Sequence, residues 1–231
     1  MVRVVKEPEE RSKEIIDAAQ SLFEGIGYDE TSINDIIQLA GIAKGTFYYY
    51  FKSKEEVLDA VINRGMDSQV QFLMKVIADN SCNALQKLET IICKNLKLCI
   101  ENAEILEYLH RKENILMHQK TLVQSVKRFA PVLAQIIQQG IDEGIFNTRY
   151  PLEVTEYLLV GTNFLFDLSV FPWKKDEYAV RIDALTEILE GTLQARKGSF
   201  KFITTQINEL YCGSIYGKKL IAIDYTASAE G

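Results

Sequence analysis

The 231-residue sequence is poor in proline and has no paired cysteine motif. Only four prolines interrupt it, which leaves long stretches free to form helices. Its four cysteines include no CxxC pair, so neither a zinc site nor a disulfide framework is predicted. We expect free thiols, buried or partly buried, at Cys82, Cys93, Cys99 and Cys212.

The sequence also lacks a long apolar run and an excess of positive charge. No stretch is long enough to span a bilayer, and residues 1–6 lack the apolar segment of a signal peptide. These features predict a cytoplasmic protein without a membrane partner. The formal charge of −6 argues against a general polyanion binder, so any nucleic-acid site must be a local patch.

Motifs of catalysis are missing as well. The sequence contains no nucleophile elbow, phosphate-binding loop or metal-binding helix motif. His110 and His118 lie eight residues apart rather than four, which makes a metal pair on one helix face improbable. We therefore expect no enzyme activity, no cofactor and no metal site.

Apolar periodicity predicts an all-α fold in which short helices come first and long helices follow. The first helix is expected from Arg11 to Phe23 or Glu24, capped by Ser12 and stopped by glycines. The long helices are predicted over 54–79, 83–102, 104–111, 115–144, 152–170 and 176–196. Residues 200–211 are compatible with a further helix, and residues 219–225 with a short strand or an ordered tail.

Two short helices joined by a glycine turn lie between residues 32 and 50. Ser32 and Asp35 form a capping-box pattern at the start of the first, which is expected to end at Gly41. The second is predicted over 44–50, and Ser53 is expected to cap the long helix that follows. This order of elements is the helix-turn-helix arrangement.

The helix over 44–50 is unusually rich in tyrosine. Phe47 and Phe51, four residues apart, share one face and can enter a core. Three consecutive tyrosines cannot all join them, because successive helical residues turn by about 100°. A purely packing helix would account for Tyr50 but not for Tyr48 and Tyr49, so we favour a DNA-reading helix whose lysine and hydroxyls contact phosphates and base edges.

Charge argues against strong binding by a single copy. Through residue 64 the chain carries eight lysines and arginines against twelve acidic residues, so a basic face must arise from placement. This favours a dimer that binds two half-sites. The acidic head also leaves an alternative hypothesis, a helical ligand-binding or partner-binding protein whose head does not read DNA.

The stretch from Thr31 through Lys54 resembles the DNA-binding region of the TetR family of transcriptional regulators. Residues 40–54 (AGIAKGTFYYYFKSK) match the signature of that family almost position by position. The resemblance implies a ligand-responsive repressor, an all-α homodimer that binds a palindromic double-stranded DNA operator and is released by a small hydrophobic or amphipathic effector.

The resemblance also implies a domain division and a set of DNA-contacting residues. It predicts a helix-turn-helix head over 1–53, a helical bundle for ligand binding and dimerisation over 54–197, and an extension over 198–231 that exceeds the usual family length. The predicted DNA-contacting residues are Thr31, Ala43, Lys44, Gly45, Thr46, Tyr48, Tyr49, Tyr50 and Lys54.

Residues 152–171 are apolar on more than one face, so their helix must be buried within the domain or against another chain. By resemblance, the helices over 152–170 and 176–196 pair with those of a partner in a four-helix bundle; burial within the monomer is the alternative. Polar and aromatic residues among the apolar helices are candidates for a ligand pocket. They are Cys99, Tyr108, His110, Met117, Tyr157, Asn163 and Phe164.

Overall fold

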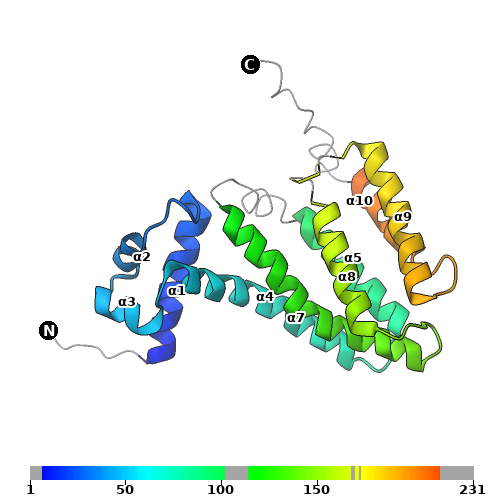
Figure 1. Cartoon of the computed structure of the whole chain (residues 1–231), viewed down its shortest axis with the longest axis horizontal. Coiled ribbons are helices and arrows are strands. Elements are labelled where there is room, and N and C mark those ends of the chain that lie inside the picture. Colours follow the sequence, from blue (N-terminus) through cyan, green and yellow to red (C-terminus); the bar gives the residue numbers. More distant parts are fainter. Residues whose placement is uncertain (1–6, 102–113, 168–169, 172, 214–231) are drawn as a thin grey trace, which may run out of the picture. The chain divides into compact units, whose positions relative to one another are not determined.

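The computed structural model describes residues 7–101, 114–167, 170–171 and 173–213, and every regular element in these ranges is a helix (Figure 1). The all-α prediction is therefore confirmed. The predicted helix over 104–111 and the predicted strand or tail over 219–225 lie outside the described residues. Within them, no helix is both long and apolar enough to cross a membrane.

The chain forms two compact units, and each is described by itself. The head unit contains residues 1–71 and 104–127, and the second unit contains residues 72–103 and 128–231. Helices α4 (Lys54–Ala78) and α7 (Ile115–Asp142) each contribute residues to both units. The border between the two compact units therefore lies within α4 and α7. The predicted boundary after residue 53, which separates a DNA-binding domain from a ligand-binding domain, stays a prediction.

Helix α1 (Pro8–Ile26) differs from its prediction at both ends. It begins three residues early, because Pro8 suits a first turn in which no backbone N–H needs an intrahelical partner. Ser12 is consequently inside the helix and caps nothing; the N-cap residue is Glu7, without a side-chain hydrogen bond. The helix also continues through Gly25 and ends where Gly27 adopts a φ of 98°.

The helix-turn-helix forms as predicted. Helix α2 (Ile33–Ala40) begins with a complete capping box between Ser32 and Asp35, and this hydrogen bonding lowers the pKa of the Asp35 carboxyl. Gly41, with a φ of 63°, ends α2 and turns the chain into α3 (Lys44–Tyr50). The Ser53 hydroxyl accepts the Glu56 N–H at the start of α4, which confirms the cap predicted there.

The core of the head unit collects apolar side chains from its first four helices. Ile15, Ala19 and Phe23 of α1 are fully buried, as is Ile36 of α2. The same core contains residues from α3 and α4 and the residues beside them, namely Tyr28, Phe47, Phe51, Val57, Leu58, Val61, Ile62 and Met66. The two phenylalanines thus lie where their spacing predicted, and they anchor α3 from below.

The second unit packs α5 (Ala84–Glu101), α8 (Pro151–Leu165), α9 (Lys175–Leu193) and α10 (Lys201–Gly213) with the C-terminal part of α7. Its core cluster is Ala84, Leu88, Ile136, Ile137, Phe146, Ile182, Leu189, Leu193, Phe200, Ile203 and Ile207. Helix α8 ends at Leu165, five residues before the predicted end. There the indole N–H of Trp173 donates to the Leu165 carbonyl, replacing a helical hydrogen bond.

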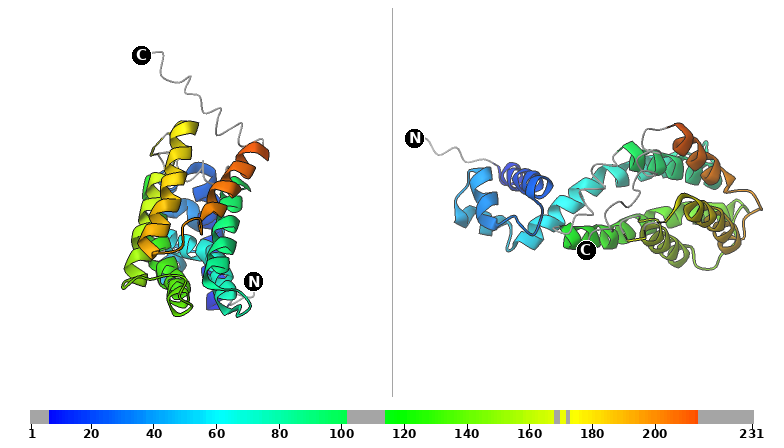
Figure 2. Two further views of the ribbon diagram at one scale, coloured as in Figure 1. Left: turned by 90° about the vertical axis from the view of Figure 1, so that its right-hand side faces the viewer. Right: turned by 90° about the horizontal axis from the view of Figure 1, so that it is seen from above.

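Helix α10 confirms the helical interpretation of residues 200–211 and lies beside α5 and α9 (Figure 2). The Glu190 carboxylate accepts the N–H groups of Gly198 and Phe200, which fixes the chain just before the helix. The Phe200 ring stacks on Phe146 with centroids 6.3 Å apart. The segment after residue 197 is therefore, as far as residue 213, an integral part of the packed unit.

Candidate nucleic-acid interface

Helix α3 divides its aromatic residues between the core and the solvent. Phe47 is fully buried, whereas Lys44 and Tyr48 are exposed and the Tyr49 side chain has 79% of its surface accessible. A helix that served only to pack would not leave two neighbouring tyrosines in water. The split favours an interface on the outer face of α3.

The exposed tyrosines are nevertheless held in defined positions. The Tyr48 ring packs edge-on against the buried Phe47 ring, with centroids 5.4 Å apart. Tyr49 packs edge-on against Tyr50 at 4.9 Å, and Tyr50 is itself half-buried. Such contacts limit the rotamers that each ring can adopt, so the loss of side-chain entropy on binding is reduced.

The turn into α3 leaves its backbone open. Ala43, the N-cap residue, and Gly45 are both exposed, and Thr46 is half-buried. A Cβ atom added at Gly45 would meet no atom of the chain within 4 Å, so internal packing does not require glycine there. Glycine at this position would instead allow a binding partner to approach the backbone closely, because no side chain stands between them.

Thr31 does not belong to this surface, contrary to the prediction. Only 1% of its surface is accessible, and its hydroxyl donates to the Gly27 carbonyl oxygen at 2.7 Å. The side chain closes the turn between α1 and α2 from the inside. Its role is structural because its one hydroxyl proton is used within the head unit.

The predicted DNA-contacting role of Lys54, a contact from its ammonium to a phosphate, also needs correction. Its ammonium donates to the carbonyl oxygens of Tyr28 at 2.7 Å, Thr31 at 2.8 Å and Asp29 at 3.3 Å. It also lies over the Tyr28 ring, 4.2 Å from the centroid. Three acceptors use all three ammonium protons, so Lys54 holds the loop over residues 28–31 and has none left for a phosphate.

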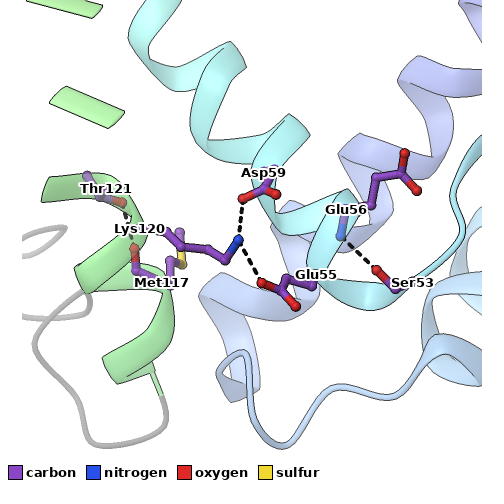
Figure 3. Close-up of polar contacts among 7 residues, drawn as sticks. All are labelled: Ser53, Glu55, Glu56, Asp59, Met117, Lys120 and Thr121. Atoms are coloured by element: carbon purple, nitrogen blue, oxygen red, sulfur yellow. Dashed lines mark hydrogen bonds and ion pairs between the residues drawn. The ribbon is translucent and has the colours of Figure 1, made fainter. Parts of the chain in front are cut away.

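The same loop is held by α7, through residues that sequence reasoning did not single out. The Asn114 side chain, fully buried beside the start of α7, accepts the Tyr28 N–H at 2.8 Å. Lys120 pairs with Asp59 at 2.7 Å and with Glu55 at 2.9 Å, both on α4 (Figure 3). No local pattern signals these contacts, since 61 and 86 residues separate the partners of the Lys120–Asp59 and Tyr28–Asn114 hydrogen bonds.

Two pKa shifts reflect this packing. Burial, followed by the charge of Glu55, raises the pKa of the Tyr28 hydroxyl above its usual value of 10.0. The hydrogen bond from Lys120 to Asp59, and then that to Glu55, raises the pKa of the Lys120 ammonium above 10.5. Both groups therefore stay protonated at neutral pH, and the free energy of unfolding falls as the pH rises from their usual pKa values through the raised ones, where each group loses its proton.

The predicted ligand residues whose side chains the structure describes lie on α7 in the head unit and on α8 in the second unit. Tyr108, His110 and the side chain of Cys99 lie outside the described residues, and Met117 is buried in the head unit. On α8, Tyr157 and Phe164 have 82% and 47% of their surface accessible, and Asn163 is half-buried. The two aromatic residues extend outward because their face of α8 is uncovered in the single chain, and their role in a ligand pocket stays a prediction. Among the described residues, no cluster of three possible metal ligands occurs.

Comparison with known proteins agrees with the helix-turn-helix. Residues 15–61 match the family described as bacterial regulatory proteins, tetR family, and residues 97–188 match the tetracyclin repressor-like C-terminal domain. The chain belongs to the TetR family. It is accordingly a DNA-binding transcriptional regulator, and both matches end before α10 begins.

Individual relatives of the TetR family extend the match over most of the chain. The fatty acid metabolism regulator protein of Bacillus subtilis is 25% identical over 184 residues, which are 79% of this chain and 93% of the relative. The transcriptional repressor KstR2 of Mycobacterium tuberculosis is 27% identical over 175 residues, 71% and 84% of the two chains. Both are regulators by name.

Solved structures of the family share the fold. FadR from Bacillus subtilis, in complex with stearoyl-CoA, superposes with a TM-score of 0.52 at 25% identity, over 79% of this chain and 95% of that one. SmeT of Stenotrophomonas maltophilia, repressor of a multidrug efflux pump, gives a TM-score of 0.57 at 22% identity, over 82% and 92% of the two chains. The second likeness concerns the fold alone.

Replacing Lys54 by methionine tests its corrected role. Lys54→Met keeps most of the apolar stem but leaves three carbonyl oxygens without their donor, so we expect the free energy of unfolding to fall by about 1–3 kcal/mol. Lys44→Met, the matched control on the exposed face, should leave it unchanged. Urea unfolding followed by circular dichroism measures both. A Lys54→Met variant as stable as Lys44→Met would contradict the internal role.

Proposed function

We propose that the protein is a dimeric cytoplasmic repressor that reads operator DNA with the outer face of α3, acts by binding rather than catalysis, and is released by an amphipathic effector. The observation that carries this proposal is the division of α3 into a buried phenylalanine face and an ordered, exposed face of lysine and tyrosines. The buried face fixes the helix, and the outer face is free to meet DNA.

The exposed face offers the groups that DNA recognition uses. The Lys44 ammonium would neutralise a phosphate, and the Tyr48 and Tyr49 hydroxyls would reach phosphates or base edges. The open backbone at Gly45 would allow close approach. Ala43, Thr46 and Tyr50 would line the rim of the same contact, whereas Thr31 and Lys54 would support it from inside the head unit.

The DNA contacts are tested by alanine substitution on α3. We expect Lys44→Ala, Tyr48→Ala and Tyr49→Ala each to weaken binding to the DNA upstream of the protein's own gene by about 5- to 100-fold, because each removes a polar contact. Lys44→Ala should also lower the salt slope by about one, since one phosphate contact is lost. Fluorescence anisotropy over a salt series measures both quantities.

Two controls separate these effects from a general loss of side chains. Lys197→Ala and Tyr150→Ala remove an exposed lysine and an exposed tyrosine from the second unit, and both should bind as tightly as the unaltered protein. If no variant differs from these controls, α3 is not the recognition helix. If the unaltered protein binds this DNA no better than random DNA, the alternative of a helical ligand-binding or partner-binding protein is favoured.

A dimer would account for two features. It would give the net-negative head a second DNA half-site, and it would cover the apolar side chains that the second unit exposes. Helix α8 exposes Tyr157, Val160 and Phe164 along one side, and α9 exposes Val180 and Ile188. Large apolar side chains at helical spacing on two neighbouring helices are typical of a covered interface. We propose that they pair with the same helices of a second copy. Their exposure in the single chain argues against the alternative of burial within the monomer.

Charge placed in this apolar surface should separate the copies. Ile188→Arg is expected to convert the dimer to a monomer at micromolar concentration, because the guanidinium would be buried opposite apolar side chains. Sedimentation velocity distinguishes the two states. Ile26→Arg, at an equally exposed isoleucine in the head unit, is the matched control and should remain dimeric. A dimeric Ile188→Arg protein would place the interface elsewhere.

The two similarities to regulators from Bacillus subtilis indicate the effector class to test first. One relative is a fatty acid metabolism regulator by name, and one solved structure holds stearoyl-CoA. An acyl thioester joins a long apolar chain to an anionic head group, which agrees with the amphipathic effector that we expected. We propose that this protein responds to a ligand of that chemistry.

Stearoyl-CoA is the probe for this proposal. At saturating concentration we expect it to lower the affinity for operator DNA by about 5- to 150-fold, the range of ordinary allosteric coupling. Stearate and CoA, each carrying one half of the ligand, should do so only weakly. Unchanged DNA affinity with stearoyl-CoA would exclude this ligand class, whereas release by CoA alone would show that the acyl chain is not recognised.

A further inference from the structure

We infer that α7 is a second positioning element for the DNA-reading head, and that Asn114 and Lys120 are its positioning residues. The inference deepens the proposed function, on which it rests, because it adds α7 to the support that Lys54 of α4 gives the loop over residues 28–31. Three side-chain contacts within the head unit carry it, and each joins a different pair of elements.

The first contact joins Asn114, the residue directly before α7, to the loop over residues 28–31. The side-chain Oδ1 of Asn114 accepts the Tyr28 N–H at 2.8 Å, and Asn114 has no accessible surface. A buried backbone N–H that loses its acceptor cannot turn to water instead, so opening this bond costs about 1–3 kcal/mol. Movement of the start of α7 therefore has to carry the loop with it.

The second contact joins α7 to α4, about one and a half turns farther along α7. Lys120 lies between Asp59 and Glu55, which are four residues apart on the same face of α4 (Figure 3). The Lys120 side chain is only 21% accessible, so water screens this pairing less than it screens an open surface pair. The bond fixes the register of α7 along α4.

The third contact closes the triangle from α4 back to the loop. Lys54, at the start of α4, donates to the carbonyl oxygens of Tyr28 and Thr31. The loop, α4 and α7 are thus tied pairwise, and none of the three can shift alone without breaking a hydrogen bond. The chain leaves this loop at Ser32, the cap of α2, and then enters α3.

Helix α7 is suited to carry a signal into this triangle. Beyond residue 127 the same helix belongs to the second unit, where Ile136 and Ile137 are buried in its core cluster. Pro131 lies between those residues and Lys120 and removes one helical hydrogen bond, but α7 continues as one helix through it. An axial shift at Ile136 and Ile137 would therefore be passed along α7 toward Lys120 and Asn114. The loop then transmits the shift to the start of α2.

The test compares Lys120→Met with Lys127→Met, a matched control at an exposed lysine two turns farther along α7. Hydrogen exchange of the Tyr28 amide reports the loop directly and needs no DNA. We expect Lys120→Met to speed this exchange about three- to tenfold and to lower DNA affinity by a similar factor, because α7 no longer holds its register. Lys127→Met should change neither quantity.

Lys120→Arg, which keeps both ion pairs, should restore slow Tyr28 exchange and separates loss of charge from loss of helix packing. Equal Tyr28 exchange in the Lys120→Met and Lys127→Met proteins, whether slow or fast, would overturn the inference. Failure of the unaltered protein to bind DNA would refute the proposed function instead, and the exchange comparison would still decide whether α7 holds the loop.

Discussion

The head unit depends on the ammonium of Lys54. The loop between α1 and α2 presents three carbonyl oxygens to this ammonium: those of Tyr28 and Thr31 are partly buried, and that of Asp29 lies at the surface. Lys54 provides all three hydrogen bonds from the first residue of α4. Because α2 and then α3 follow directly from this loop, the orientation of the recognition helix is set by a lysine that lies behind it.

This arrangement divides the residues of the signature segment into two groups. One group makes its contacts within the head unit: Phe47 and Phe51 pack in the core, and Thr31 and Lys54 hydrogen-bond within the loop between α1 and α2. The other group is held in place but faces outward, with Lys44, Gly45, Tyr48 and Tyr49 at its centre. The exposed residues can serve a partner because the inner residues already satisfy the needs of the fold.

Whether a contact could be predicted from the sequence depended on how many residues separate its two partners along the chain. The capping box at Ser32, the turn at Gly41 and the bounds of α3 involve neighbours within about four residues, and all three were predicted correctly. Residues 200–211 were compatible with a helix, and Ile203 and Ile207, four residues apart, are buried on α10. Local hydrogen bonds and local periodicity are visible in a single sequence.

Contacts between distant segments had no such signal. Lys54 carries the same charge whether it binds a phosphate or a carbonyl oxygen, and only the fold shows that Tyr28 and Thr31 reach it first. Asn114 and Lys120 follow no motif, and the exposure of Tyr157 depends on which faces of α8 the rest of the chain leaves uncovered. The sequence therefore predicted which residues of α3 are exposed, but not the long-range contacts that support the helix from inside the head unit.

The most direct measurement observes the two ammonium groups themselves. In protein with 15N-labelled lysine, NMR signals of the Lys44 and Lys54 ammonium groups can be followed while operator DNA is added. Our account predicts that Lys54, with its protons already bound, exchanges slowly with water in the free protein and keeps its chemical shift. The Lys44 signal should move as DNA binds. A Lys54 signal that moves as far as that of Lys44 would contradict the account.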